Sequence, residues 1–153
     1  MKSLVVYVTH KGNTRIVADA IGEVLGKHGP AEVIPADEAP PVIGPDVDLL
    51  VVGGPTEGHG MTPEQRAYLD RLEAPTVRGR AAAAFDTRIN WPRLLSGSAA
   101  DGIAKRLREM GARVIEPVGS FIVNAEPTLL TGELERAREW ATDVAVEVAP
   151  VPV

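Results

Sequence analysis

Cysteine is absent from this sequence of 153 residues. Its absence excludes disulfide bonds, thiolate metal sites, iron–sulfur clusters and cysteine nucleophiles. Aromatic residues are also few, with two each of Trp, Tyr and Phe, so side chains that could stack on a planar ligand are scarce. No apolar run reaches the roughly 18 residues that a membrane helix needs, and the first residues show no signal-peptide pattern. We therefore expect a cytoplasmic protein that does not insert into membranes.

The charge balance is acidic, with a formal net charge of −5 and a pI of about 5.2. Nucleic-acid binding needs clustered Lys and Arg to displace phosphate counterions, so we expect no nucleic-acid partner. No internal repeat or linker divides the chain. We expect a single domain over residues 1–148, followed by a frayed tail over residues 149–153.

Apolar strands and amphipathic helices alternate along the sequence. Continuous apolar runs predict buried strands at residues 3–8, 49–52 and 81–85, with further strands around 32–34 and within 113–123. Helical periodicity and end signals predict helices over about 15–25, 62–73, 98–110 and 133–146. This alternation predicts an α/β protein with a three-layer, doubly wound, five-stranded parallel sheet. Ligands bind such sheets beyond the carboxyl ends of the strands, where loops 9–14, 53–61 and 86–95 should meet.

The loop after the first strand has the composition of an anion site. Thr9, Gly12, Asn13 and Thr14 lie between a buried strand and a helix N-terminus. The unpaired backbone N–H groups and the dipole of that terminus favour an anion, and the threonine hydroxyls add donors. The spacing matches neither the dinucleotide fingerprint nor the P-loop. By itself the loop is compatible with phosphate binding and equally with an ordinary helix cap.

Residues 5–14, Val-Val-Tyr-Val-Thr-His-Lys-Gly-Asn-Thr, resemble the phosphate loop of flavodoxins, [ST]-x-[ST]-G-x-T after the first strand. Residues 50–59, which end in Gly-Gly-Pro-Thr-Glu-Gly-His, resemble the second flavin-contacting loop of that family, and Phe85-Asp86-Thr87-Arg88 stands where its third loop leaves the fourth strand. The element order is similar over essentially the whole chain. The resemblance implies a short-chain flavodoxin-like fold with strand order 2-1-3-4-5 and FMN as cofactor.

The resemblance also implies a role for each loop. Thr9, Gly12, Asn13 and Thr14 would hold the phosphate, Pro55 and Thr56 would begin the loop over the flavin edge, and Gly58 would turn its peptide carbonyl toward the flavin N5–H on reduction. Asp86 and its neighbours would meet the pyrimidine edge of the ring. The residues expected to contact the cofactor are Thr9, His10, Lys11, Gly12, Asn13, Thr14, Pro55, Thr56, Glu57, Gly58, His59, Gly60, Asp86, Thr87, Arg88 and Trp91.

Two residues in these loops depart from the flavodoxin pattern, and a third is a candidate for stacking on the flavin. Lys11 replaces a hydroxyl residue and could add a charge-assisted contact to the phosphate. Glu57 stands where many flavodoxins carry a stacked aromatic ring, and its charge would disfavour an anionic reduced flavin. Trp91 is the candidate for stacking on the flavin, whereas Trp140 on the last helix is expected in the core.

Other chemistries are less well supported by the motifs. His10, His59, Glu57 and Asp86 should converge, but no His-x-x-His or His-x-x-x-His pair lies within one element, so we expect no metal site. The acidic residues of a phosphoacceptor domain and the G-x-S-x-G elbow of a hydrolase are both missing. We expect no catalytic residue.

Three functions are compatible with these motifs. The first is an FMN-dependent electron carrier that serves redox partner proteins or a small electron acceptor, and it is the interpretation we favour. The second is a small NAD(P)H-dependent oxidoreductase of the quinone-reductase type. The third is a flavodoxin-fold interaction module that has lost flavin, for which Glu57 in place of an aromatic residue is the main argument.

Overall fold

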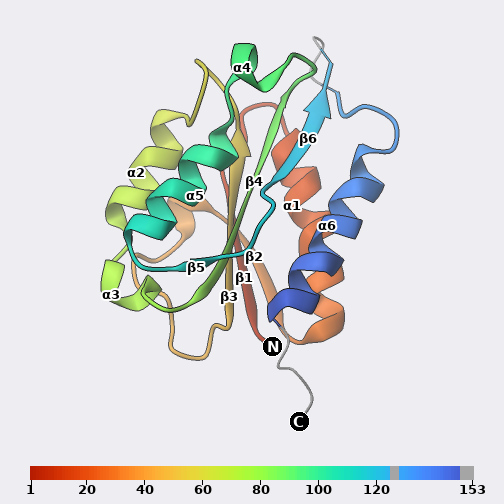
Figure 1. Cartoon of the computed structure of the whole chain (residues 1–153). Helices are drawn as coiled ribbons and strands as arrows, with labels where there is room; N and C mark the ends of the chain where they lie inside the picture. Colours follow the sequence, from red (N-terminus) through yellow and green to blue (C-terminus); the bar gives the residue numbers. More distant parts are fainter. Residues whose placement is uncertain (125–127, 149–153) are drawn as a thin grey trace.

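A parallel β-sheet lies between two layers of helices in the computed structural model, which describes residues 1–124 and 128–148 (Figure 1). Its strands are β1 (Ser3–Tyr7), β2 (Ala31–Pro35), β3 (Leu49–Pro55), β4 (Ala81–Ile89), β5 (Arg113–Val114) and β6 (Gly119–Val123). The order across the sheet is β2-β1-β3-β4-β5, with β6 also paired to β4, and every pairing is parallel. The predicted strand order 2-1-3-4-5 is confirmed.

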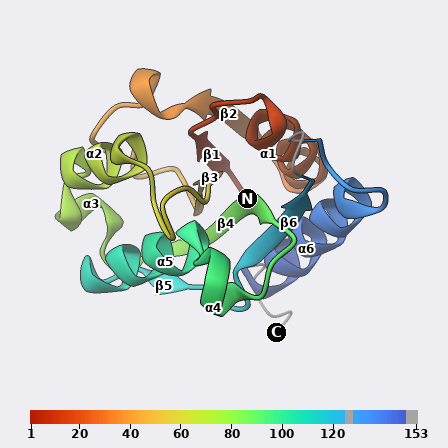
Figure 2. The same cartoon turned by 90° about the horizontal axis from the view of Figure 1, so that it is seen from above.

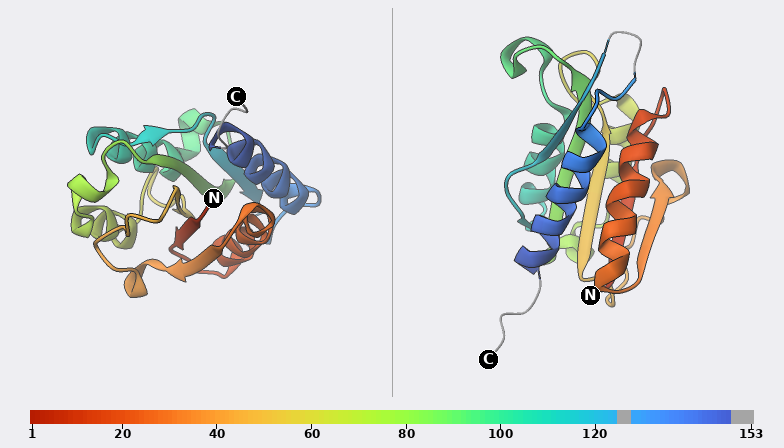
Figure 3. Two further views of the ribbon diagram at one scale, coloured as in Figure 1. Left: turned by 90° about the horizontal axis from the view of Figure 1, so that it is seen from below. Right: turned by 90° about the vertical axis from the view of Figure 1, so that its right-hand side faces the viewer.

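Two groups of helices cover the two faces of the sheet (Figure 2). The helices are α1 (Asn13–Leu25), α2 (Pro63–Arg71), α3 (Ala74–Val77), α4 (Arg93–Ser96), α5 (Ala99–Glu109) and α6 (Glu133–Val148), with 3-10 turns η1 (Gly26–His28) and η2 (Ala36–Glu38). α1 and α6 lie side by side on one face (Figure 3). α2, α3 and α5 pack on the other.

The apolar strands fill both cores because successive side chains point to opposite faces. Val5 and Val51 pack against α1 and α6, and their neighbours Val6 and Val52 pack toward α2 and α5. The alanine run of β4 behaves in the same way, although alanine favours helices. Its small side chains are all buried, which leaves room for larger residues of the helices on both faces.

The fifth strand position differs from the prediction of one continuous strand. β5 pairs with the start of β4 and β6 pairs with its end, and residues 115–118 separate them. Pro117 lies in this gap and has no backbone N–H to donate to the ladder. The two segments together occupy the edge where one strand was expected.

Other boundaries also moved. β4 continues to Ile89, so residues 86–89, expected as the start of a loop, extend the sheet toward the site. The remainder of that loop contains the short helix α4. α2 ends at Arg71, and Pro75 in the first turn of α3 starts a new helix. The tail expected to fray, residues 149–153, lies outside the described residues.

Among the residues that the structure describes, no helix is both long and apolar enough to cross a bilayer.

Tyr68 on α2 is buried and, within the described part of the chain, its hydroxyl has no hydrogen-bond partner. Burial raises the pKa of this phenol well above its ordinary value. Because the unfolded chain ionises near pH 10 and the folded chain does not, stability falls as pH rises above about 10. We expect Tyr68→Phe to raise the free energy of unfolding by about 1 kcal/mol at neutral pH, since an unpaired buried hydroxyl is costly. Urea denaturation of the unaltered protein and of Tyr68→Phe at pH 7 and above pH 10 tests this. If the free energy of unfolding falls by the same amount in both proteins at the higher pH, the prediction is contradicted.

Candidate functional site

A cavity of about 360 Å³ opens where the carboxyl ends of β3, β4 and β6 meet the start of α1. This is the edge at which parallel α/β sheets bind ligands. The predicted residues that line it are His10, Lys11, Asn13, Thr14, Pro55, Thr56, Glu57, Thr87 and Arg88. All three predicted loops therefore contribute to one cavity.

The loop at residues 9–14 presents an uncapped helix end. Gly12 is the N-cap of α1 and has φ 92°, the left-handed region that favours glycine. Its N–H donates to Thr9 Oγ1 (3.0 Å), which fixes the turn. Among the described residues no side chain caps α1, and its first turn contains no acidic residue. The positive end of the helix dipole is therefore not neutralised by a carboxylate of its own first turn.

Thr14 joins this helix end to β4. Its side chain is 2% exposed, and its Oγ1 lies 3.0 Å from Thr87 Oγ1 in a buried hydrogen bond. Both residues line the cavity. This hydrogen bond fixes the end of the predicted phosphate loop against the end of β4.

Residues 57–60 form a tight reversal beside the cavity. Glu57 and Gly60 exchange backbone hydrogen bonds of 3.0 and 3.1 Å, and the two residues between them, Gly58 and His59, both have positive φ (56° and 67°). This is the pattern of a two-residue type I′ turn. Gly97 is required opposite it, because a Cβ there would lie 1.9 Å from the carbonyl oxygen of His59. Gly58, His59 and Gly60 do not line the cavity.

His10 lies between two carboxylates. Its Nδ1 is 2.5 Å from Glu57 Oε2, and its Nε2 is 3.4 Å from Glu64 Oε2 at the start of α2. Hydrogen bonds from the backbone N–H of Glu64 and from the Thr62 hydroxyl, together with the charge of His10, hold the pKa of Glu64 below its usual value. A protonated His10 would offset the negative charge that Glu57 brings to the cavity.

Asp86 occupies a different place from the one expected. Its side chain is fully buried and does not line the cavity. Oδ1 accepts from Ser120 Oγ (2.6 Å), and Oδ2 accepts from Ser98 Oγ (2.7 Å), from the N–H of Ala100 (3.0 Å) and from Thr56 Oγ1 (3.2 Å). The carboxylate thus ties β4 to β6, to α5 and to the end of β3. This geometry supports a positioning role for Asp86 and disfavours direct contact of its side chain with a ligand.

Arg88 and Trp91 lie at the outer side of the site. Arg88 donates through Nε to Ser120 Oγ (2.7 Å) and through Nη1 to the carbonyl of Trp91 (2.8 Å), which anchors the segment after β4. The Trp91 side chain is 56% exposed and does not line the cavity. Trp140, in contrast, is buried in a cluster with Phe85 and Phe121, as expected from the sequence.

Among the described residues, sequence reasoning missed three that form the cavity wall. Ile89, Val123 and Asn124 also line it, the first at the end of β4 and the others at the end of β6. The same rule that directed attention to the strand ends applies to the fifth strand position, and it could have indicated Val123 and Asn124. Ile89 was missed because β4 is longer than its alanine run.

Comparison with known proteins adds to this geometry. The flavodoxin family profile matches residues 5–140. No curated protein sequence gives a significant match. Among solved structures, a flavodoxin from the domain Archaea is 27% identical, with a TM-score of 0.81, over 97% of this chain and 99% of that chain. Oxidised flavodoxin 1 from Bacillus cereus is 21% identical with a TM-score of 0.80, over 98% of this chain and 100% of that one.

The two-electron reduced flavodoxin from Megasphaera elsdenii is 22% identical with a TM-score of 0.71, over 94% of this chain and 98% of that one. Similarity at this level of identity reports on the fold, whereas the family profile reports on the sequence itself. Because that profile spans nearly the entire described chain and the strand order agrees with it, this chain belongs to the flavodoxin family.

Proposed function

We propose that the chain binds FMN in the 360 Å³ cavity and acts as an electron carrier. The observation that carries the proposal is the position of the uncapped start of α1 beside a cavity lined by Lys11, Thr14 and Thr87. A phosphate dianion is stabilised by backbone N–H groups, by hydroxyl donors and by a cation, and all three converge here. A Cβ on Gly12 would meet no other atom within 4 Å, so the loop backbone is open to a close ligand.

The ring of FMN would lie between the ends of β3 and β4. Pro55, Ile89 and Val123 give the cavity apolar walls, while Thr56 and Asn124 give it polar groups. Apolar walls with a few placed polar groups are typical of cofactor sites. Trp91 is exposed next to this site, and we propose that it stacks on the bound ring. Glu57 faces His10, so its charge does not argue against a flavin as strongly as the sequence alone suggested.

When bound, FMN supplies the one- and two-electron chemistry. The chain's own part is to hold the phosphate, to shape the ring site and to leave one edge of it open. The relatives were solved in oxidised and in two-electron reduced forms, which supports a redox role for this member. The proposal includes a cytoplasmic location and a partner that is a redox protein or a small electron acceptor.

The test is a titration of flavin-free protein with FMN, followed by flavin fluorescence and visible absorption. We expect stoichiometric quenching with a dissociation constant at or below about 1 μM. An unchanged spectrum with excess FMN would refute the proposed site. The loaded protein is then mixed anaerobically with NADPH: slow or absent bleaching is expected of a carrier, and rapid bleaching without a partner enzyme would make the chain a reductase.

A further inference from the structure

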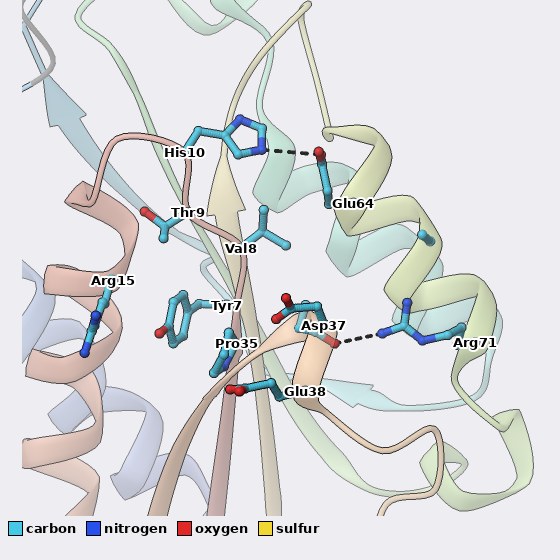
Figure 4. A pocket seen from close by; sticks show the side chains of 12 residues that line it. Tyr7, Val8, Thr9, His10, Arg15, Pro35, Asp37, Glu38, Glu64 and Arg71 are labelled. Atoms are coloured by element: carbon cyan, nitrogen blue, oxygen red, sulfur yellow. Dashed lines mark hydrogen bonds and ion pairs between the residues drawn. The ribbon is translucent and has the colours of Figure 1, made fainter.

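A second and larger cavity, of about 580 Å³, opens on the other side of the phosphate loop (Figure 4). Its walls are the carboxyl ends of β1 and β2, the turn η2, one side of α2 and Arg15 in the first turn of α1. Thr9 and His10 belong to it, and His10 lines the flavin cavity as well. The loop at residues 9–14 therefore separates two adjoining cavities.

The sheet order explains why there is one cavity on each side. β1, which carries the phosphate loop, lies between β2 and β3. The flavin cavity is built on the β3 and β4 side, and the second cavity on the β2 side. In Rossmann-type sheets with a G-x-G-x-x-G turn, an acidic residue after the second strand binds the ribose hydroxyls of a dinucleotide. This chain lacks that turn, but Asp37 offers a carboxylate at the corresponding place after β2.

Some charged groups of the second cavity are paired, as His10 is with Glu64 (3.4 Å), whereas others have no charged partner among the described residues. Asp37 and Glu38 lie in η2, the turn directly after β2; both are exposed, and their side chains form no hydrogen bond or ion pair with other described residues. Arg71 reaches in from α2; its Nη2 donates to the carbonyl of Ala36 (2.7 Å), and within the described chain no carboxylate pairs with it. Figure 4 shows this guanidinium beside the turn that carries Asp37. The cavity thus offers carboxylates that can accept hydrogen bonds from hydroxyl groups and a guanidinium that can donate to a phosphate.

The remaining lining is suited to a flat, weakly polar group. Val8, Pro35 and Ala67 form apolar surface next to the charged residues. A purine base packs well on such surface, while a small inorganic anion would leave it unused.

We propose that this cavity binds the adenosine 5′-phosphate group of an adenine nucleotide. Asp37 accepts hydrogen bonds from the ribose hydroxyls, Arg71 binds the phosphate, and the base packs against Pro35 and Val8. The group has two possible sources: it is joined to the flavin in FAD, or it belongs to a separate nucleotide bound beside FMN. The inference rests on the proposed function only for the neighbouring flavin, because the cavity and its lining exist without it.

Three probes separate the sources. FMN and FAD are each titrated into flavin-free protein by fluorescence, and AMP is titrated by calorimetry into both the flavin-free and the FMN-loaded protein. FAD that binds at least about tenfold more tightly than FMN identifies the joined source, since a few added hydrogen bonds are worth at least that factor. AMP that binds the FMN-loaded protein with a dissociation constant below about 1 mM identifies the separate source.

Two variants test whether the adenine nucleotide binds in this cavity. Asp37→Asn and Arg71→Gln should each weaken FAD or AMP about tenfold and leave FMN affinity within about twofold. Arg66→Gln is the matched control, because Arg66 is an exposed residue of the same helix that does not line the cavity. It should change neither affinity.

The inference is overturned if FAD shows no advantage over FMN and AMP does not bind, or if the two variants weaken FMN as much as the adenine nucleotide. Failure of FMN to bind would refute the proposed function alone. The AMP titration of flavin-free protein would still decide whether the second cavity takes an adenine nucleotide.

Discussion

Replacing Asp86 with alanine is expected to lower the free energy of unfolding by about 3–5 kcal/mol. The carboxylate is fully buried and accepts from four donors on three other parts of the fold. Alanine leaves those donors without an acceptor. The hydroxyls can turn to other partners, but the N–H of Ala100 is held by its helix and cannot. Urea denaturation followed by circular dichroism measures the loss.

Asp86→Asn is the control for this experiment. It keeps the size and one carbonyl oxygen but directs an NH₂ group at some of the same donors, so an intermediate loss is expected. It also provides a folded variant if the alanine protein is too unstable to study. A loss below about 1 kcal/mol for Asp86→Ala would mean that the four hydrogen bonds do not organise the site.

Thr14→Ala is expected to weaken FMN about ten- to hundredfold and riboflavin less than about twofold. Thr14 lies in the first turn of α1, and its buried hydroxyl contacts Thr87 at the cavity wall. If the phosphate is held here, removal of the hydroxyl costs a charge-assisted hydrogen bond that riboflavin, which has no phosphate, never makes. Fluorescence titration of both flavins gives the two affinities directly.

Thr14→Ser separates the hydroxyl from the methyl group of the same residue. Serine keeps the donor and should retain most of the FMN affinity. Equal losses for FMN and riboflavin in Thr14→Ala would place the phosphate elsewhere. They would indicate that this threonine supports the cavity only through its contact with β4.

The parts of the fold that follow from local pattern could be predicted. The valines of β1 and β3, the periodic residues of α1 and the capping box at Thr62 and Gln65 all lie where the sequence places them. β4 was recognised although alanine favours helix, because turns frame a short run. The full length of β4 could not be predicted, because residues 86–89 include charged and polar side chains and form strand only by pairing with β3 and β6.

The cavity was predictable in outline and less so in detail. Lys11, Thr14 and Thr56 were found because strand ends of a parallel sheet converge. Asp86 shows the limit of that reasoning. The resemblance to flavodoxins implied a contact with the pyrimidine edge of the ring, but the Asp86 carboxylate meets hydroxyls from residues 56, 98 and 120, which no local pattern links to it. Tertiary partners of this kind decide whether a polar residue serves a ligand or the fold.

Because of the placement of the two tryptophans, the intrinsic fluorescence of the chain can report on two different events. Trp140 is buried among Phe85 and Phe121 and donates through Nε1–H to the carbonyl of Pro117 (2.9 Å), so its emission reports on the integrity of the interior. Trp91 is more than half exposed, and its carbonyl accepts from Arg88, which lines the 360 Å³ cavity, so its emission is set by water and by anything that covers it. Replacing either tryptophan with phenylalanine leaves the emission of the other, which then comes from one known position. Ligand capture and unfolding can then be followed in separate samples without an attached dye.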